Sequence, residues 1–442
     1  MFRRILIANR GEVAVRVLRT CKRLGVEVVA AYTHDEAELS WLKEADHRIC
    51  IGPVRSYLDQ DAILQAAKQT GCSALHPGWG FLSENATFAA RCEAIGIRFI
   101  GPPSHLIRSM GDKIEARRSM KALGLDPIPG TDEPLGSVED ARLIAQDIGY
   151  PVLLKAASGG GGRGMRRVYE EGNLASAFAE ASSEARASFG DGRLYMEKLI
   201  EAGRHIEFQV IGDCTGRVLV LGERECSIQR RHQKLLEESP SPVLEPEQRK
   251  AVSERIAKAL SAAGYTSAGT VEMLRDPSGA LYFMELNTRL QVEHPVTEMT
   301  TGIDLVEWQL RVAANERLPE SWRAAQGHAI EVRINAEDPE RDFLPTPGAL
   351  DAFSFPSGDG IRVETHLQEG DTVSPHYDSM IAKLIVHGAT REEAIESMLS
   401  AIDQCDIRGV FTTLDLHRSI LNHAGFRSGG YDTQTLAKMQ ES

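Results

Sequence analysis

The sequence predicts a mixed α/β and α+β protein that begins with a doubly wound parallel sheet. Residues 4–8 form a short apolar strand, residues 13–24 carry apolar side chains at helical spacing, and residues 26–33 form a second strand. A strand, a helix and a second strand in this order are typical of a parallel sheet covered by helices. From about residue 330, β-like stretches precede a helix at residues 390–404, which is the order of an α+β region.

The bulk composition bounds the number of domains and excludes several classes of protein. The 442 residues, 42% of them hydrophobic, suit about three domains, and a net charge of -13 argues against a nucleic-acid partner. The seven cysteines include no Cys-x-x-Cys pair, so we expect free thiols. The first residues do not resemble a signal peptide, and no apolar run approaches the roughly 18 residues of a membrane helix. We therefore expect a cytoplasmic protein with no membrane partner.

The alternation of strands and helices continues through the first hundred residues. A helix is expected over residues 59–70, a short strand at residues 72–77, a helix beginning near Ser83 and a strand at residues 97–101. The first domain should therefore close near residue 105.

Four successive glycines at residues 159–162 stand between two predicted strands. The stretches GYPVLLKAA before the run and MRRVYEE after it are apolar and rich in strand-forming residues. A glycine loop with Lys155 at its mouth fits a cover over phosphates, although neither common nucleotide fingerprint is present. The run alone leaves a nucleotide site and a plain surface loop equally open. We expect residues 150–200 to be a small hinged subdomain.

The turn DPSG at residues 276–279 lies between two alternating runs and predicts a β-hairpin. With these four residues as the loop, Glu272 lies opposite Phe283, and Glu285 is its diagonal neighbour. Glu272 and Phe283 then share a face with Glu285 and Asn287. Converging carboxylates and an amide oxygen suit Mg²⁺. A solvated charged face without an ion is the alternative.

Two further clusters of charge are candidates for anion chemistry. We expect the second strand of the hairpin to continue to His294, so that Glu293 lies near Arg289 and acts either as a general base or as its salt-bridge partner. In the basic run ERECSIQRRHQK, strand geometry would point Arg230, His232 and Lys234 the same way, as an anion-binding face. An exposed basic strand neutralised by neighbouring glutamates is the alternative.

Taken in order, these motifs resemble one enzyme family. With Lys113 in GDK, the glycine loop after Lys155, MEK at residues 196–198, RRHQK and ELNTRLQVEHPVTE, the chain is similar to the biotin carboxylases of the ATP-grasp superfamily over nearly its whole length. The resemblance implies an N-terminal Rossmann-like domain at residues 1–110 and a central ATP-grasp domain at residues 111–329. It also implies a mobile glycine-rich lid at about 130–202 and a C-terminal biotin carboxylase domain at 330–442.

The resemblance also implies roles for individual residues. ATP would be bound by Lys113, Lys155, Gly161, Gly162, Glu197, Lys198, Leu199, Ile200, His205, Gln229, His232, Glu272 and Glu285. Two Mg²⁺ or Mn²⁺ ions would be held by Glu272, Glu285 and Asn287. Bicarbonate would be bound by Lys234, Arg289 and the backbone of Val292. The residues implied to be catalytic are Lys234, Arg289, Glu293 and Arg333, with Arg333 facing the ureido oxygen of biotin.

The implied reaction begins when Glu293 deprotonates bicarbonate, which attacks the γ-phosphate of ATP to give carboxyphosphate. Carboxyphosphate yields CO₂ and phosphate, the phosphate takes the N1' proton of biotin, and Arg333 stabilises the biotin enolate that captures CO₂. Because the sequence lacks a biotin-bearing AMKM motif, the implied partners are a biotin carboxyl carrier protein and carboxyltransferase subunits. Acetyl-CoA carboxylase, in fatty acid synthesis, is the commonest setting. A propionyl-CoA, pyruvate or other acid carboxylase, or a different ATP-grasp ligase, is the alternative.

Several positions depart from the pattern that the resemblance leads us to expect. Four glycines stand where relatives usually carry five, and Trp79 replaces a tyrosine. The stretch GVFTT at residues 409–413 lacks the usual Lys-Thr-Asn, which puts the local structure there in doubt. Arg23 stands near the dimer contact of the family, where an acidic residue can occur, so the usual homodimer is left open.

Overall fold

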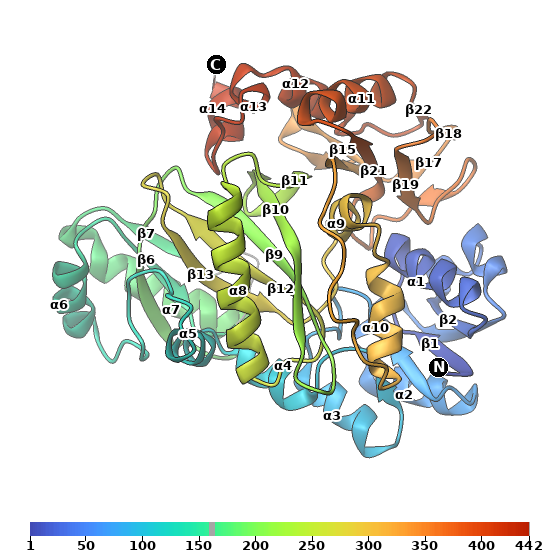
Figure 1. Ribbon diagram of the computed structural model, residues 1–442, viewed down its shortest axis with the longest axis horizontal. Helices are drawn as coiled ribbons and strands as arrows, with labels where there is room; N and C mark the ends of the chain where they lie inside the picture. Colours follow the sequence, from blue (N-terminus) through green and yellow to red (C-terminus); the bar gives the residue numbers. More distant parts are fainter. Residues whose placement is uncertain (159–163, 442) are drawn as a thin grey trace.

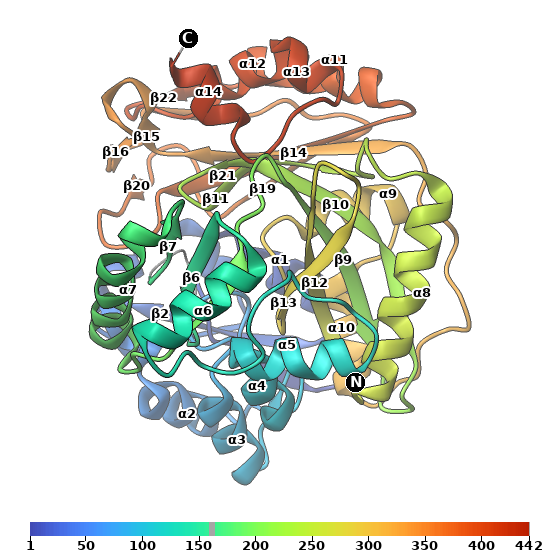
Figure 2. The same ribbon diagram turned by 90° about the vertical axis from the view of Figure 1, so that its left-hand side faces the viewer.

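The computed structural model describes residues 1–158 and 164–441, in which the strands form one parallel sheet, one large antiparallel sheet and several small ones (Figures 1 and 2). Gly161 and Gly162, expected to contact ATP, lie outside the described residues.

The N-terminal sheet is parallel with strand order β3-β2-β1-β4-β5, which confirms the doubly wound prediction. In the first strand, Ile5 and Ile7 pack on one side of the sheet, while Leu6 packs on the other. Both faces of the sheet are therefore buried, as expected for a sheet between helices. Its strands are β1 (Arg4–Ile7), β2 (Glu27–Thr33), β3 (His47–Gly52), β4 (Ala74–His76) and β5 (Arg98–Phe99). Its helices are α1 (Gly11–Arg23), α2 (Gln60–Gln69) and α3 (Ala86–Ala94).

Strand β3 was not expected from the sequence. It pairs with β2 at the edge of the sheet, and half of its residues are exposed, so it lacks a clear apolar pattern. Short 3₁₀ helices lie at His34–Glu36, Ser40–Glu44, Val54–Leu58, Glu171–Asn173 and Pro339–Arg341. After the N-terminal sheet, α4 (Ser104–Gly111) and α5 (Lys113–Ala122) lead to the centre of the molecule.

The glycine run joins two antiparallel strands of a small separate layer. This layer has strand order β7-β6-β8 and its own hydrophobic core, and it lies at the left in Figure 1. Gly164, just after the run, has φ +69°, and a Cβ there would meet the Ala156 side chain at 3.0 Å. A glycine therefore lets the chain re-enter the layer against β6. The elements are β6 (Val152–Ala156), β7 (Arg166–Val168), β8 (Leu194–Lys198), α6 (Val138–Ile148) and α7 (Leu174–Phe189).

The central feature is an eight-stranded antiparallel sheet with order β13-β12-β9-β10-β11-β14-β21-β19. It crosses the expected boundary at residue 330, because β11 pairs directly with β14. Its strands are β9 (Arg204–Gly212), β10 (Val218–Arg230), β11 (Gln233–Ser239), β12 (Ser267–Arg275), β13 (Leu281–Asn287), β14 (His328–Asn335), β19 (Ile361–Thr365) and β21 (Met380–Gly388). The helices between these strands are α8 (Pro246–Ala262), α9 (His294–Thr301) and α10 (Leu305–Ala313).

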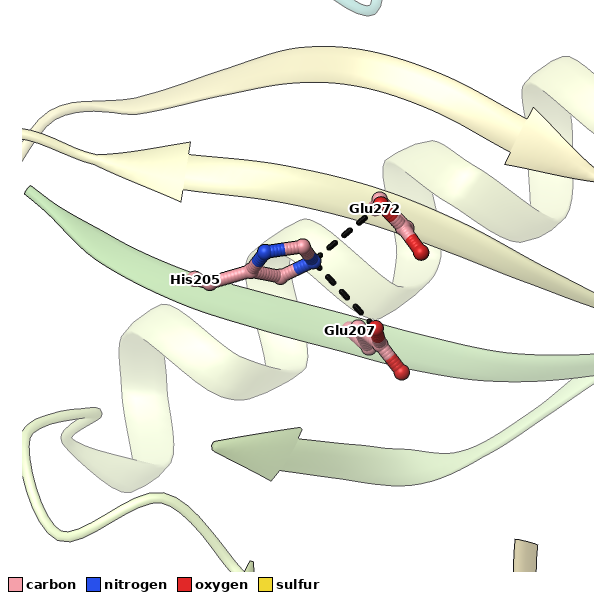
Figure 3. A group of neighbouring side chains, drawn as sticks. All are labelled: His205, Glu207 and Glu272. Carbon is pink, nitrogen blue, oxygen red and sulfur yellow. Dashed lines mark ion pairs between the residues drawn. The ribbon is translucent and has the colours of Figure 1, made fainter. Parts of the chain in front are cut away.

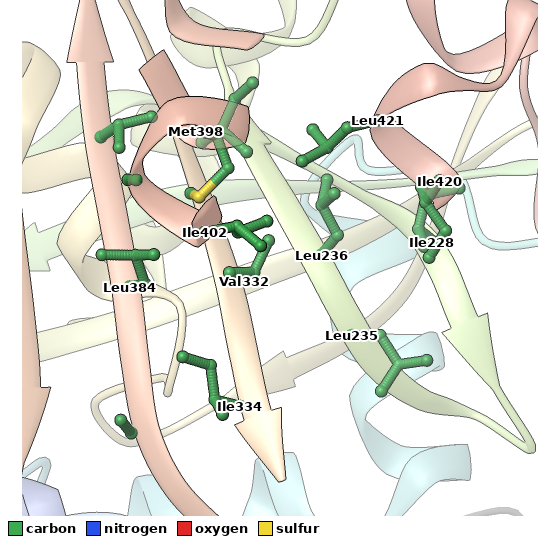
Figure 4. Packing of buried hydrophobic residues seen from close by; sticks show 14 of the residues in the cluster. Ile228, Leu235, Leu236, Val332, Ile334, Leu384, Met398, Ile402, Ile420 and Leu421 are labelled. Atoms are coloured by element: carbon green, nitrogen blue, oxygen red, sulfur yellow. The ribbon is translucent and has the colours of Figure 1, made fainter. Parts of the chain in front are cut away.

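The C-terminal helices lie together beyond this sheet, at the top of Figure 2. Leucine, isoleucine and valine side chains from β11, β14, β21, α11 and α12 form one continuous core there (Figure 4). Its helices are α11 (Arg391–Asp403), α12 (Leu414–Asn422), α13 (Ala424–Arg427) and α14 (Thr435–Glu441). Small two-stranded sheets pair β15 (Glu337–Asp338) with β16 (Leu344–Pro345), β17 (Gly348–Ala349) with β20 (Thr372–Val373), and β18 (Ala352–Ser354) with β22 (Asp406–Arg408).

The expected hairpin forms between β12 and β13, but its predicted register is wrong. Glu272 lies directly opposite Glu285, and Met273 lies opposite Phe283, so Met284 is an extra residue at a β-bulge. Because of the bulge, Phe283 points into the core while Glu285 stays on the face of Glu272. The two glutamates are thus nearer to each other than the predicted diagonal.

The basic run also has a different shape from the predicted one. β10 ends at Arg230 and β11 begins at Gln233, so residues 231 and 232 form the tip of a hairpin with φ values of +48° and +66°. Arg230, His232 and Lys234 therefore do not share one strand face. Arg230 instead pairs with Asp342, and the Lys234 side chain points into the molecule, where it pairs with Glu207.

The bulge predicts losses of stability of different size at two adjacent residues. Phe283→Ala should lower the free energy of unfolding by about 3–5 kcal/mol, because it leaves a cavity in the core. Met284→Ala, at a half-buried side chain, should cost only about 1 kcal/mol. Urea denaturation followed by circular dichroism measures both. Equal losses from the two variants would contradict the observed register.

Candidate functional site

Glu293 lies at the centre of the candidate site, in a loop and not in the expected strand. β13 ends at Asn287, residues 288–293 belong to no helix or strand, and α9 begins at His294. Pro295 near the start of α9 is pre-organised for a helix, which explains the change of direction. The prediction that the second strand of the hairpin continues to His294 is therefore wrong.

The carboxylate of Glu293 is fully buried and bound by two cations. Its Oε1 lies 2.8 Å from Lys234 Nζ, and its Oε2 lies 2.9 Å from an Arg333 guanidinium nitrogen. Arg289 instead pairs with Glu84 at 2.7 Å, so the salt bridge considered between Arg289 and Glu293 is not formed. Glu293 thus faces Lys234 and Arg333, the residues that the resemblance assigns to bicarbonate and to biotin.

Lys234 joins three carboxylates from different parts of the chain. Its Nζ contacts Glu207, lies 3.1 Å from Glu272 Oε1 and binds Glu293. Burial by itself would lower the pKa of this amine, but the three carboxylates outweigh it and raise the pKa well above its usual value. Lys234 is therefore a permanent cation in the site.

His205 closes the other side of this cluster (Figure 3). Its Nε2 lies 3.2 Å from Glu207 and 3.1 Å from Glu272. Burial opposes a charge on the ring, but the Glu272 carboxylate outweighs it and raises the pKa of His205 to about 10. Arg224, also fully buried, binds Glu207 at 3.1 Å from the far side.

The expected metal ligands lie together. Glu272 and Glu285 are cross-strand neighbours, and Asn287 Nδ2 donates to Glu272 Oε1 at 2.9 Å. The Lys113 ammonium lies 2.5 Å from Glu285 and lowers the pKa of that carboxyl to about 2. Burial would raise the pKa of Glu272, but Lys234 outweighs it and lowers the pKa to about 2. Both carboxylates are therefore ionised, and this all-oxygen donor set fits Mg²⁺ or Mn²⁺.

Several expected nucleotide ligands meet between the small layer and the large sheet. Lys155 Nζ lies 2.9 Å from Glu197 Oε2 across the β6–β8 pair, and both side chains are buried. The next residue, Lys198, turns away and donates to the carbonyls of Gly149 and Tyr150 at 2.9 and 3.0 Å. Lys155 Nζ lies 5.5 Å from the centre of the Tyr195 ring, and Lys113 lies near both Tyr195 and Lys155.

The remaining expected nucleotide residues are more dispersed. The Leu199 N–H donates to the Pro151 carbonyl, and Ile200 follows it as a half-buried residue. Gln229 lies opposite Lys234 in the β10–β11 pair. His232 is at the hairpin tip, where partial burial and nearby cations lower its pKa.

Arg333 is held in place by β14 and by residues 409–413, the stretch whose local structure the sequence left in doubt. Its Nε donates to Glu237 Oε1 at 2.7 Å. Its carbonyl accepts from Thr413 Oγ1 at 3.0 Å and lies 2.7 Å from His417 Nε2. The stretch at residues 409–413 thus supports Arg333 without the usual lysine and asparagine.

Three residues that complete the site were not expected from the sequence: Glu207, Glu237 and Glu84. Glu207 lies in β9, in which polar and apolar residues alternate, so its place on the same strand face as His205 was the available signal. Glu84 and Glu237 could be recognised only by their long-range partners, Arg289 and Arg333.

Three family models match the chain. They are "Biotin carboxylase, N-terminal domain" over residues 1–107, "Carbamoyl-phosphate synthase L chain, ATP binding domain" over 112–321, and "Biotin carboxylase C-terminal domain" over 331–438. Among the described residues, no helix combines the length and the apolar character needed to cross a bilayer.

Individual relatives match over nearly the full length. The biotin carboxylase of Allochromatium vinosum is 48% identical over 445 residues, which covers 99% of each chain. A pyruvate carboxylase subunit of Methanothermobacter thermautotrophicus is 48% identical over 98% of this chain and 89% of its own. The structure of the biotin carboxylase domain dimer of Hydrogenobacter thermophilus 2-oxoglutarate carboxylase, with MgADP, ADP and bicarbonate, has a TM-score of 0.97. It is 48% identical and covers 100% of this chain and 98% of the other.

The charge balance at Lys234 predicts a large effect on stability. Lys234→Met should lower the free energy of unfolding by about 3–5 kcal/mol in metal-free buffer, because buried carboxylates lose their cation. Adding Glu207→Gln should recover part of that loss, since it removes one of the unpaired charges. Lys250→Met, at an exposed lysine, is the control and should have no measurable effect. A Lys234→Met protein as stable as the wild type would refute the assignment of Lys234 as the central cation.

Proposed function

The chain belongs to the biotin carboxylase family, and on that premise we propose which of its residues perform each part of the reaction. It is an ATP-dependent ligase that carboxylates biotin with bicarbonate. The assignment of residues depends on one observation, that the buried carboxylate of Glu293 lies between Lys234 and Arg333.

We propose that ATP lies between the small β6–β8 layer and the large sheet. Lys155 and Lys113 supply positive charge for its phosphates, and the segment from Glu197 to Ile200, at the end of β8, meets the adenine. His205 lies in β9, Gln229 lies in β10, and His232 lies at the tip of the β10–β11 hairpin. Lys155 and Lys113 are held in place by ion pairs with Glu197 and Glu285, at 2.9 and 2.5 Å.

Glu272, Glu285 and Asn287 would hold Mg²⁺ or Mn²⁺. A bound ion neutralises phosphate charge during phosphoryl transfer. His205 and Lys234 already compensate the charge of Glu272, and Lys113 compensates that of Glu285, so the carboxylates stay ionised and available as ligands.

We propose that bicarbonate binds beside Lys234 and Arg289, with the Val292 N–H as a further donor. Glu293 accepts the bicarbonate proton, and the resulting oxyanion attacks the γ-phosphate to give carboxyphosphate and ADP. Lys234 and Arg289 hold the anion and reduce the cost of bringing two negative reactants together. Lys234 and Arg333 keep Glu293 ionised and hold its carboxylate in place, so it is present as a proton acceptor.

Arg333 is proposed to act in the second step. Carboxyphosphate breaks down to CO₂ and phosphate, the phosphate removes the N1' proton of biotin, and the Arg333 guanidinium stabilises the enolate oxygen. Glu237 and Glu293 both bind Arg333, which fixes the plane of its guanidinium.

The proposed partners are a biotin carboxyl carrier protein and carboxyltransferase subunits. Acetyl-CoA carboxylase is the proposed setting. Relatives of similar identity serve pyruvate and 2-oxoglutarate carboxylases, so these acceptors are the alternatives. A homodimer is also proposed, to be tested by sedimentation. The Hydrogenobacter relative forms a domain dimer, whereas Arg23 of this chain is bound internally by Asp304 and Glu307 at 2.7 and 2.6 Å.

We also propose the domain division 1–110, 111–329 and 330–442, with the lid at about 130–202. The ends of the three family matches support it, as does the separate core of the β6–β8 layer.

Glu293 provides the direct test of the mechanism. The wild-type protein should cleave ATP only with bicarbonate and Mg²⁺ present, and free biotin should stimulate cleavage. Glu293→Gln should lower turnover by about 10²–10⁴-fold, because the base is lost, and leave ATP binding nearly unchanged. Phosphate release and isothermal titration with a non-hydrolysable ATP analogue measure the two effects. Glu254→Gln on the surface of α8 is the control. Retained turnover in Glu293→Gln would assign the base to another residue.

The acceptor can be identified from the partners of the native protein. Purified from its own cells under mild conditions, the chain should bring down a biotinylated carrier and a carboxyltransferase. The complex should then transfer ¹⁴C from bicarbonate to acetyl-CoA faster than to propionyl-CoA, pyruvate or 2-oxoglutarate. Preferential labelling of another acceptor would reject the acetyl-CoA assignment.

A further inference from the structure

Lys383 is a fully buried lysine that the proposed mechanism does not use. It lies in β21, directly opposite Arg333 of β14. Its Nζ donates to the carbonyl of Val292 at 2.7 Å and lies 3.1 Å from Glu12 Oε2. A buried ammonium therefore joins the loop before α9 to the first turn of α1.

Glu12 is itself held from the opposite side. Its Oε1 accepts a hydrogen bond from Trp79 Nε1 at 3.0 Å, and its side chain is buried. Trp79, which replaces the expected tyrosine, thus supplies an N–H to this carboxylate. A chain of polar contacts runs from the N-terminal sheet through Glu12 and Lys383 to Val292.

The loop that Lys383 contacts is held by side chains and not by regular secondary structure. Residues 288–293 lie outside helices and strands, and the Thr288 N–H donates to Glu84 Oε1 at 3.0 Å. His294 approaches the Gln291 carbonyl with its N–H at 3.3 Å and its Nδ1 at 2.8 Å. Lys383 holds the next carbonyl, that of Val292. Two successive peptide groups are therefore fixed by separate donors.

Fixing these carbonyls also fixes the groups that the reaction would use. In a trans peptide the C=O and the following N–H point in opposite directions within one plane. His294 therefore sets the direction of the Val292 N–H, and Lys383 sets the plane from which the Glu293 side chain extends. The Glu293 carboxylate is held separately by Lys234 and Arg333.

We propose that Lys383, supported by Glu12, is a positioning residue for bicarbonate. It orients the Val292–Glu293 peptide, from which the Glu293 side chain extends, while His294 holds the preceding peptide, which carries the Val292 N–H. The N–H and the carboxylate are thereby placed to meet the same anion. This inference rests on the proposed function, in which both groups bind bicarbonate. A misplacement of about 1 Å in such a group can cost about 10²-fold in rate.

The test separates positioning from a role in stability. Lys383→Met should raise the KM for bicarbonate by about tenfold or more and lower kcat, while the KM for ATP stays within about twofold. The double variant Glu12→Gln, Lys383→Met removes both buried charges and so avoids an unpaired carboxylate. It should show the same rise in the KM for bicarbonate, because the Val292 carbonyl still lacks its ammonium donor.

Arg249→Met is the matched control. Arg249 lies 2.8 Å from Glu223, a fully buried carboxylate, and its loss should lower stability without changing the KM for bicarbonate. An unchanged KM for bicarbonate in either folded Lys383 variant would overturn the inference. Failure of both to fold would assign the lysine to stability and overturn it as well. The proposed function fails separately, if wild-type ATP cleavage does not depend on bicarbonate.

Discussion

The site depends on the compensation of charge in a place that water barely reaches. The carboxylates of Glu207, Glu272 and Glu293 are all buried, and each would be costly to ionise alone. Lys234 contacts all three of them, while Arg224 and Arg333 bind Glu207 and Glu293 from outside. These contacts keep the carboxylates ionised in a nearly dry environment, where charge interactions are strong. The carboxylates can then bind cations, and their basic partners can bind anionic substrates.

The large antiparallel sheet brings these charges together from distant parts of the chain. Glu207 comes from β9, Lys234 from β11, Glu272 from β12 and Arg333 from β14, and the strands are linked through one continuous ladder of backbone hydrogen bonds. Rigid strands are better supports for a defined geometry than loops are. The exception is the loop that carries Glu293, whose backbone is bound by the side chains of Glu84 and Lys383, from distant parts of the chain, and of the adjacent His294.

Local periodicity was enough to predict the parallel sheet, its helices and the grouping of Glu272, Glu285 and Asn287. It failed where one residue altered the pattern, since a bulge at Met284 cannot be told from regular alternation. It also failed at pairs far apart in sequence, such as Arg289 with Glu84, because only the folded chain sets these distances. Glu84 and Glu237 were missed for this second reason, whereas Glu207 had a local signal in the alternation of its strand.

The pairing of β11 with β14 has a consequence for how the protein is made. The two strands are separated by α8, the β12–β13 hairpin, α9 and α10, all of which leave the ribosome before β14 does. Until then β11 presents an unpaired edge that can associate with other chains. Lys234 and Glu237 lie on that same strand, so Glu237 acquires its arginine only late in translation. This edge of the nascent chain is therefore open to association with other chains while the residues between β11 and β14 are synthesised.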